Sequence, residues 1–238
     1  MLSLFFVDKL SGGSSQLLDK DDAHHAIKVL RVKVGEEIMV SDGAGSWVSG
    51  PIEEVGKKSL LIKVLEHGEK KSIKPELVIV QAITKSDRNK EMLDLITVAG
   101  VDRIIPWQSD RSISKWQPDS AEKWESTIKE SCKQARRVVI PKLSNSVDSK
   151  QLAEILSSSP YSLIFHEDAE TKFSELNIPK DVAIIYLVIG PEGGITEEEL
   201  QMFNGGTSNI IKLGEPVLRS AHAGFAALAA VQTKLGRW

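Results

Sequence analysis

The sequence predicts an α/β protein in which a small β-barrel domain precedes a larger domain built on a mostly parallel sheet. Short β-type segments separated by turn residues fill positions 36–65, a spacing typical of a small barrel. From Leu77 onward, apolar strand segments alternate with amphipathic helices, which is the pattern of an α/β sheet. The polar segment 67–75 between them reads as a linker. It predicts two domains, residues 1–72 and 73–238.

The first domain begins with the apolar and aromatic residues 2–7. A helical segment is expected to start at residues 19–22 and to continue through Leu30. The strands that follow are predicted at 38–40, 47–48 and 60–65, with turns at 42–45, at Gly50-Pro51 and at 56–58.

The second domain is expected to cover its sheet with helices. Its strands are predicted at residues 77–83, 103–106, 162–165, 183–189 and 210–213. Apolar residues share one helical face from Met92 to Ala99, before Gly100, and a second from Trp124 to Ala135. An alanine-rich helix covers residues 221–235, and its small side chains allow close packing.

Composition narrows the classes of function. With 41% hydrophobic and 26% charged residues among 238, the chain has the make-up of an ordinary globular protein. The single cysteine, Cys132, excludes an intrachain disulfide and a multi-cysteine zinc site, and we expect its thiol in the core. A net charge of −3 argues against coating nucleic acid by bulk electrostatics. Without a signal-peptide pattern or a long apolar span, the chain is expected to be cytoplasmic, with no membrane contact.

The most informative segment is an apolar strand that runs into Gly190-Pro191-Glu192-Gly193-Gly194 and then into a helix. Thr196 and Glu199 form a capping box at the start of that helix. A glycine-rich turn at the carboxyl end of a strand offers backbone amides and close approach to a ligand. The same turn is also compatible with a tight connection and nothing more.

Nucleotide-binding motifs do not explain this turn. It lacks the lysine and the serine or threonine of a phosphate loop, and Gly43-Ala44-Gly45 lacks the third glycine of a dinucleotide fingerprint. The three glutamates that open the following helix disfavour a phosphate there. The sequence therefore favours a neutral or cationic ligand over ATP or NAD.

A second informative segment, residues 213–220, leads into the alanine-rich helix. By composition, that helix is a segment docked on the core. Arg219 is different, because an arginine just before a tightly packed apolar helix needs an anionic or polar partner.

Together these segments resemble a known family, the SPOUT-class knotted RNA methyltransferases, and within it the ribosomal small-subunit RNA uridine-N3 methyltransferases. The resemblance covers nearly the whole chain. Its motifs stand here as HHAIKVLR at 24–31, KSDR at 85–88, GVDRIIP at 100–106, KQARR at 133–137 with Pro141, IGPEGG at 189–194, and LG at 213–214 with VLR at 217–219. The sequence departs from the family pattern at Ser86, at 135–137 and at 220–223.

The resemblance implies a SPOUT-type α/β domain whose C-terminal chain forms a trefoil knot, preceded by a PUA-like β-barrel that binds RNA, in a homodimer. The cofactor would be S-adenosyl-L-methionine, held by Ile189, Gly190, Pro191, Glu192, Gly193 and Gly194 and by Leu213, Gly214, Val217, Leu218 and Arg219. The substrate would be a uridine of 16S rRNA within the small ribosomal subunit, methylated at N3. No metal is expected, since His166-Glu167-Asp168 lacks the second histidine of a zinc helix.

Methylation of uridine N3 requires removal of a weakly acidic proton and stabilisation of charge on O2 and O4. Arginine supplies charge with a fixed donor fork, so we expect Arg219 and Arg88 in catalysis. The residues expected to bind RNA are His25, Arg31, Arg136 and Arg137. Glu192, Asp87 and His222 are the candidate bases, and the sequence does not choose among them.

Two alternative functions remain open at this point. A non-catalytic RNA-binding or ribosome-assembly module is disfavoured by the intact glycine turns. A SPOUT methyltransferase acting on another RNA is disfavoured by the HHAIKVLR segment and by the extent of the resemblance.

Overall fold

A computed structural model describes residues 2–179 and 181–238, and of Ser86 and Asp87 it describes the backbone only. The chain forms two compact units. One contains the residues up to Ser72 together with Lys129–Ile140, and the other contains Ile73–Ile128 and Pro141–Trp238. Residues 129–140 thus join the first unit, although they are flanked in sequence by the second, and no pattern in the sequence indicates this.

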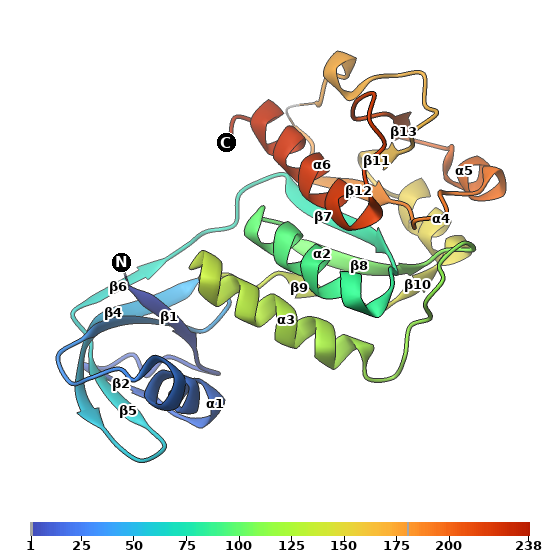
Figure 1. The fold of residues 1–238 in the computed structure, drawn as a ribbon. Coiled ribbons are helices and arrows are strands. Elements are labelled where there is room, and N and C mark those ends of the chain that lie inside the picture. Colours follow the sequence, from blue (N-terminus) through green and yellow to red (C-terminus); the bar gives the residue numbers. More distant parts are fainter. Residues whose placement is uncertain (1, 180) are drawn as a thin grey trace. The chain divides into compact units, whose positions relative to one another are not determined.

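The first unit is built on a six-stranded sheet (Figure 1). Its strands are β1 (Ser3–Phe6), β2 (Ser15–Leu18), β3 (Glu37–Ser41), β4 (Ser46–Val55), β5 (Leu60–Lys63) and β6 (Glu66–Glu69). They follow the order β1-β3-β4-β5-β2, with β6 paired to β4, and only the β1–β3 pairing is parallel. This sheet confirms the predicted small β domain.

The predicted helical segment of the first unit is also present. It consists of α1 (Lys20–His24), followed without a break by a π-helix, His25–Leu30. Ala23 and Ala26 of this segment pack into the same core as Ile38 and Val40, which alternate on the inner face of β3.

Two predictions for this unit were wrong. Gly50-Pro51, expected as a turn, lies inside β4. A Cβ at Gly50 would come within clashing distance of the Lys63 carbonyl, so the glycine serves a close approach of strands instead of a turn. The expected linker 67–75 likewise begins within β6, which continues the sheet as far as Glu69.

The second unit is built on a seven-stranded sheet in which every described pairing is parallel. Its strands are β7 (Glu76–Ala82), β8 (Arg103–Gln108), β9 (Lys142–Leu143), β10 (Val147–Asp148), β11 (Ser162–Phe165), β12 (Ile184–Ile189) and β13 (Ser208–Ile211). Their order is β10-β8-β7-β12-β11-β13, with β9 on β8. The five predicted strands are all found, with ends shifted by at most two residues. The short strands β9 and β10 were not predicted.

Helices cover both faces of this sheet (Figure 1). They are α2 (Ser86–Val98), α4 (Ser149–Ser157), α5 (Glu197–Phe203) and α6 (Ser220–Lys234), with a 3-10 turn at Phe173–Glu175. A further helix, α3 (Ser120–Ala135), begins in this unit, and its residues from Lys129 onward belong to the first unit. Val78 and Val80 of β7 share a core with residues of α4 and α5. Ile79 and Gln81 point to the other face, where a Cβ at Gly224 of α6 would lie 3.8 Å from Cδ1 of Ile79 and 3.3 Å from Oε1 of Gln81. The glycine therefore allows α6 to pack closely on this face. The predicted α/β domain with a mostly parallel sheet is confirmed.

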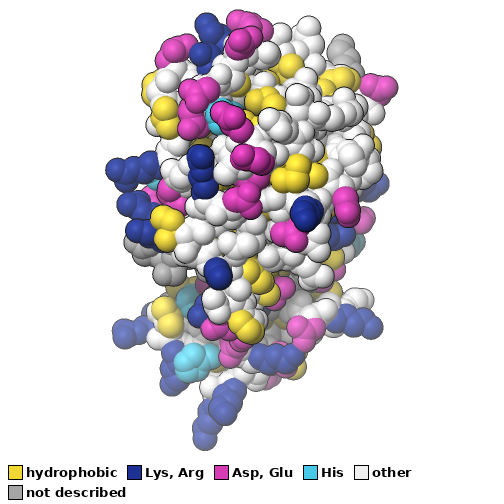
Figure 2. Space-filling model, turned by 90° about the vertical axis from the view of Figure 1, so that its right-hand side faces the viewer, with side chains coloured by type: hydrophobic (Ala, Val, Ile, Leu, Met, Phe, Trp, Pro, Cys, Tyr) yellow, Lys and Arg dark blue, Asp and Glu magenta, His cyan; other side chains and the backbone are white. Residues whose placement is uncertain are grey.

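The surface carries no uniform field of charge on the face that Figure 2 shows, where basic, acidic and hydrophobic side chains are interspersed. That distribution agrees with the net charge of −3. Among the helices of the described residues, none has the length and apolar character needed to cross a membrane.

Candidate active site

The candidate site lies at the carboxyl edge of the parallel sheet of the second unit. The chain leaves β7 toward β8 on one side, whereas β12, on the other side of β7, connects toward β13. Open α/β sheets bind ligands at such a switch point. A cavity of about 550 Å³ lies here, lined by Lys85 and Arg88 after β7, by Pro191, Glu192 and Gly194 after β12, and by residues 217–221 after β13.

A second cavity, of about 80 Å³, adjoins the first. It is lined by residues 165–167 after β11, by 212–218 after β13 and by Ala223. Glu167, Val217 and Leu218 line both cavities. The two glycine-containing segments that the sequence singled out, 189–194 and 213–219, therefore meet at one place.

The backbone at these turns excludes side chains. Gly194 has a φ of 74°, a conformation that costs an L-residue strain, and it lines the larger cavity. A Cβ at Gly190 would lie 2.7 Å from Cγ1 of Ile195. Gly190 therefore allows close packing of the turn against Ile195, and Gly194 leaves main chain bare at the cavity wall, which fits a cofactor such as S-adenosylmethionine that lies against backbone amides.

The predicted capping box at Thr196 and Glu199 is confirmed, and the glutamate does more than cap. Its carboxylate is fully buried, and Oε2 accepts a hydrogen bond of 3.0 Å from the Thr196 N–H. Oε1 accepts hydrogen bonds from the Asp110 N–H at 2.9 Å and from the Ser149 hydroxyl at 2.6 Å. Glu199 therefore ties the glycine turn after β12 to the loop after β8 and to α4.

Because Glu199 holds the backbone of Asp110, the next residue, Arg111, is placed beside the glycine turn. Its Nη1 atom donates a hydrogen bond of 2.9 Å to the carbonyl of Gly193. The neighbouring Asp110 has a raised pKa, because partial burial and the charges of Glu199 and Glu198 oppose its ionisation. Arg111 thus supports the glycine turn from outside the cavity, a contact that the sequence did not suggest.

Ser220, where the sequence departs from the family pattern, holds the turn from the other side. Its hydroxyl donates a hydrogen bond of 2.5 Å to the carbonyl of Gly190 and accepts one of 3.1 Å from Nε2 of Gln81. Gln81 is fully buried in β7. The first turn of α6, the glycine turn and β7 are therefore connected by one chain of hydrogen bonds.

The two predicted catalytic arginines, Arg219 and Arg88, line the same cavity. Nη1 of Arg88 lies 3.3 Å from Oε2 of Glu91, whose Oε1 lies 3.0 Å from Nε2 of His222. The hydrogen bond with His222, aided by Arg88, lowers the pKa of the Glu91 carboxyl. Among the described residues, Arg219 has no ion-pair partner, so its guanidinium is available to an anionic ligand.

The three candidate bases differ in where the structure places them. Glu192 lines the larger cavity. His222 lies one turn into α6 and is engaged with Glu91. The side chain of Asp87 lies outside the described residues.

The four residues predicted to bind RNA all belong to the first unit. His25 opens the π-helix, and Arg31 ends it with a φ of 54°. Arg136, with a φ of 53°, and Arg137 follow the end of α3. Arg31 and Arg136 are exposed, and His25 and Arg137 are half-buried.

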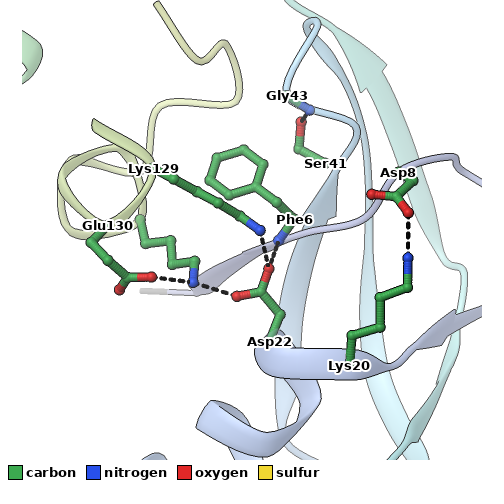
Figure 3. A network of polar contacts seen from close by, with 9 residues as sticks. Phe6, Asp8, Lys20, Asp22, Ser41, Gly43, Lys129 and Glu130 are labelled. Carbon is green, nitrogen blue, oxygen red and sulfur yellow. Dashed lines mark hydrogen bonds and ion pairs between the residues drawn. The ribbon is translucent and has the colours of Figure 1, made fainter. Parts of the chain in front are cut away.

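Lys133, which begins the KQARR motif, forms an ion pair with Asp22. The Asp22 carboxylate also accepts hydrogen bonds from Lys129 at 3.1 Å and from the Phe6 N–H at 3.2 Å (Figure 3). Burial raises the pKa of Asp22, but the hydrogen bonds and charges of Lys133 and Lys129 outweigh it, so the pKa lies below its ordinary value. These contacts anchor residues 129–140 within the first unit.

Sequence reasoning missed several residues of the site. Lys85 and Ile113 line the larger cavity and Glu167 lines both, yet none was assigned to the cofactor. Each follows a parallel strand, β7, β8 or β11, at its carboxyl end. That position was the available signal, since such ends meet at one edge of the sheet. Among the described residues, no group of three or more His, Cys, Asp or Glu side chains is arranged to hold a metal ion.

Comparisons with known proteins find relatives that match nearly the whole chain. Residues 71–232 match the family described as RNA methyltransferase domain, and residues 18–65 match the RNA methyltransferase PUA domain. The chain is 30% identical to Ribosomal RNA small subunit methyltransferase E of Mycobacterium bovis, over 99% of this chain and 93% of that protein. It is 26% identical to the protein of the same name from Bacillus subtilis, over 91% and 90%.

Solved structures resemble the whole chain as well. Ribosomal RNA small subunit methyltransferase E from Neisseria gonorrhoeae, crystallised bound to S-adenosyl methionine, superposes with a TM-score of 0.85 at 27% identity and covers 98% of both chains. A Legionella pneumophila methyltransferase in complex with the cofactor SAM gives a TM-score of 0.87 at 26% identity over the same share of both chains.

Proposed function

Because the chain belongs to the RNA methyltransferase family, whose methyltransferase and PUA domains both match it, we propose that it methylates N3 of a uridine in 16S rRNA, using S-adenosyl-L-methionine. One observation carries the proposal. The two glycine-containing turns meet around adjoining cavities at the switch point of the sheet, with two arginines on the wall.

The cofactor is assigned to these turns. Residues 189–194 and Leu213, Gly214, Val217, Leu218 and Arg219 would hold it, and Glu167, shared by both cavities, joins them. The bare main chain at Gly194 supports this assignment. When bound, S-adenosylmethionine supplies a methyl group activated by a sulfonium.

Residues of this chain assist deprotonation of the uracil at N3 and stabilise the anion that forms. The N3 proton must leave, and the resulting negative charge spreads over O2 and O4. Arg219 stabilises that charge with its guanidinium fork, and Arg88, steadied by Glu91, assists it. Of the candidate bases, Glu192 is the carboxylate whose described side chain lines the cavity.

The proposal includes the SPOUT topology. The segment that follows β13 is held at both ends by hydrogen bonds. The backbone of Lys212 is hydrogen-bonded to the backbone of Thr171 and Phe173, and the Ser220 hydroxyl is hydrogen-bonded to the carbonyl of Gly190. It then enters α6, which packs on α2, β7 and β12. This path supports a C-terminal trefoil knot around the cofactor.

The remaining parts of the proposal concern RNA and assembly. Residues 1–72, which share one compact unit with residues 129–140, form the RNA-binding domain, and the rest of 73–238 forms the methyltransferase domain. His25, Arg31, Arg136 and Arg137 bind the RNA backbone. The enzyme acts as a homodimer on the small ribosomal subunit, without a metal, in the cytoplasm.

Two measurements test the function together. The first is calorimetric titration of the purified protein with S-adenosylmethionine. The second is methyl incorporation into small subunits from cells that lack the enzyme, with the product mapped by nucleoside analysis. Stoichiometric binding and label at uridine N3 are expected. Absence of cofactor binding would leave an RNA-binding module as the function, and label at another nucleotide would leave a methyltransferase of different specificity.

A further inference from the structure

A third cavity lies in the second unit, outside the candidate active site. Its volume is about 380 Å³, within the roughly 300–1,000 Å³ usual for ligand sites. Three elements enclose it: the first half of α2, the loop that follows β8 and the start of α3. The proposed cofactor site uses none of its lining residues.

Aromatic side chains form one wall of this cavity. The rings of Trp116 and Trp124 meet edge to face, with centroids 5.1 Å apart and an interplanar angle of 76°. Trp124 is buried, whereas Trp116 is only half-buried and lines the opening. An indole held in this way offers a stacking surface for a flat ring.

Trp116 is fixed in place before any ligand arrives. The side-chain amide oxygen of Gln108, at the end of β8, accepts a hydrogen bond of 3.0 Å from the backbone N–H of Trp116. The same amide donates one of 3.1 Å to the carbonyl of Ser114. The loop therefore presents its indole from a rigid strand end, which lowers the entropic cost of binding.

Cations and a free amide surround the aromatic wall. Lys90, Lys115 and Lys123 all line the cavity, and only Lys123 has an ion-pair partner among the described residues, Asp119 at 2.7 Å. The Asn89 side chain accepts a hydrogen bond from the Thr84 hydroxyl, and its amide nitrogen has no partner in the described part of the chain. The cavity thus combines a stacking surface, two unpaired ammonium groups and a hydrogen-bond donor.

This cavity adjoins the candidate active site along two separate elements. Arg88 lines the larger cavity and Asn89, the next residue of α2, lines this one. In the loop after β8, Ile113 lines the larger cavity and Ser114 lines this one. The Cα atoms of consecutive residues lie about 3.8 Å apart, so the linings of the two cavities meet in both elements, at a spacing that neighbouring nucleotides of one strand can span.

We propose that this cavity binds a nucleotide next to the target uridine in the single-stranded RNA substrate, with its base stacked on Trp116 and its phosphates at Lys90 and Lys115. Aromatic stacking combined with lysines along the backbone is the usual chemistry of single-strand recognition. The inference rests on the proposed function, since it takes the larger cavity as the place where the uridine reacts.

The test measures the Kd of the cofactor-loaded full chain for 16S rRNA from cells that lack the enzyme, over a series of KCl concentrations. Trp116→Ala should raise the Kd by about tenfold, whereas Trp116→Phe should stay within threefold because a ring remains. The double variant Lys90→Gln/Lys115→Gln should raise the Kd and lower the slope of log Kd against log[KCl] by about 1.4. Lys150→Gln on α4, a matched exposed lysine, should behave as wild type.

The outcomes separate this inference from the proposed function. If Trp116→Ala and the double lysine variant bind rRNA with the wild-type Kd and salt slope, the cavity is not an RNA subsite, even if the enzyme methylates uridine. If they bind weakly while the wild-type chain transfers no methyl group, the subsite stands and the proposed function fails. Calorimetric titration with S-adenosylmethionine should give the same Kd for every variant, because none of these residues lines the two cofactor cavities.

Discussion

The buried carboxylate of Glu199 accepts a hydrogen bond of 2.9 Å from the backbone N–H of Asp110, 89 residues earlier in the chain. This single contact fixes the loop after β8 against the start of α5. Arg111, the next residue, then reaches the carbonyl of Gly193 in the glycine turn. The geometry of the proposed cofactor site therefore depends on a carboxylate that never touches it.

Replacing Glu199 should cost stability. Glu199→Ala leaves the Asp110 N–H, the Ser149 hydroxyl and the Thr196 N–H without their acceptor, and we expect a loss of about 3 kcal/mol in the free energy of unfolding. Urea denaturation followed by circular dichroism measures it. The exposed neighbour Glu198 is the control, and Glu198→Ala should change stability by less than about 0.5 kcal/mol. Equal losses from both substitutions would contradict the role given to Glu199.

The glycine turn should not tolerate a side chain. Gly194→Ala places a Cβ at a φ of 74°, beside the Glu167 carboxylate, and should weaken S-adenosylmethionine binding by roughly tenfold, equivalent to about 1.4 kcal/mol. Calorimetric titration gives the two Kd values. Gly205→Ala is the matched control, because a Cβ there meets open space. A Gly194→Ala protein that binds the cofactor as tightly as wild type would remove Gly194 from the site.

Arg219 should be needed for turnover and not for folding. Its side chain is exposed at the cavity and makes none of the described ion pairs, so Arg219→Ala should leave the melting temperature unchanged. Loss of a donor to the developing oxyanion should slow single-turnover methylation by about 100-fold or more. Arg219→Lys keeps the charge without the fork and should fall between the two. Methylation at the wild-type rate by Arg219→Ala would assign the role to another residue.

The ion pairs of Asp22 should give stability that depends on pH. The folded pKa of Asp22 lies below its ordinary value of 3.8, so its ionised form stabilises the folded chain above that value. The contribution disappears as the pH falls through the folded pKa. Asp22→Asn should therefore be less stable than wild type by about 3 kcal/mol at pH 7, with the difference shrinking below pH 4. Urea unfolding across this range tests it, and a difference that grows toward acid would contradict the assignment.

Cys132 should be inert in the folded protein. Burial raises the pKa of its thiol to about 11, with only partial relief from the charge of Arg137. At pH 8 the thiolate is then about 100-fold rarer than for a thiol with the ordinary value of 9.0, and its side chain is fully buried. Iodoacetamide should label the native chain at a negligible rate and the chain in 6 M urea at the rate of a free thiol. Rapid native labelling would show that this part of the first unit opens readily.

Much of the fold was predictable because its signals are local. Hydrophobic periodicity located the parallel strands, and the capping box at Thr196 fixed the start of α5. The wrong predictions arose where a residue type that usually marks a turn is required by a contact with a segment distant in sequence. Gly50 reads as a turn residue, yet it is glycine because the Lys63 backbone approaches it from another strand.

The candidate site shows the same division. The turns at 190–194 and 213–219 were found because glycine and proline mark them in sequence. Glu167 and Arg111 were missed, because their position after a strand is a signal that they share with many residues outside the site. Only the strand order β7-β12-β11-β13 brings Glu167 to the cavity. The anchoring of residues 129–140 in the first unit depends likewise on the pairing of Lys133 with Asp22.

That interleaved segment affects how such a protein can be recombined. Because residues 129–140 complete the first unit, a contiguous fragment ending at Ser72 would leave the Asp22 carboxylate buried without Lys129 and Lys133. Grafting the first unit onto another domain by one crossover would therefore yield a defective module. Exchange of such units during evolution requires two coordinated insertions, and this favours their inheritance as a pair.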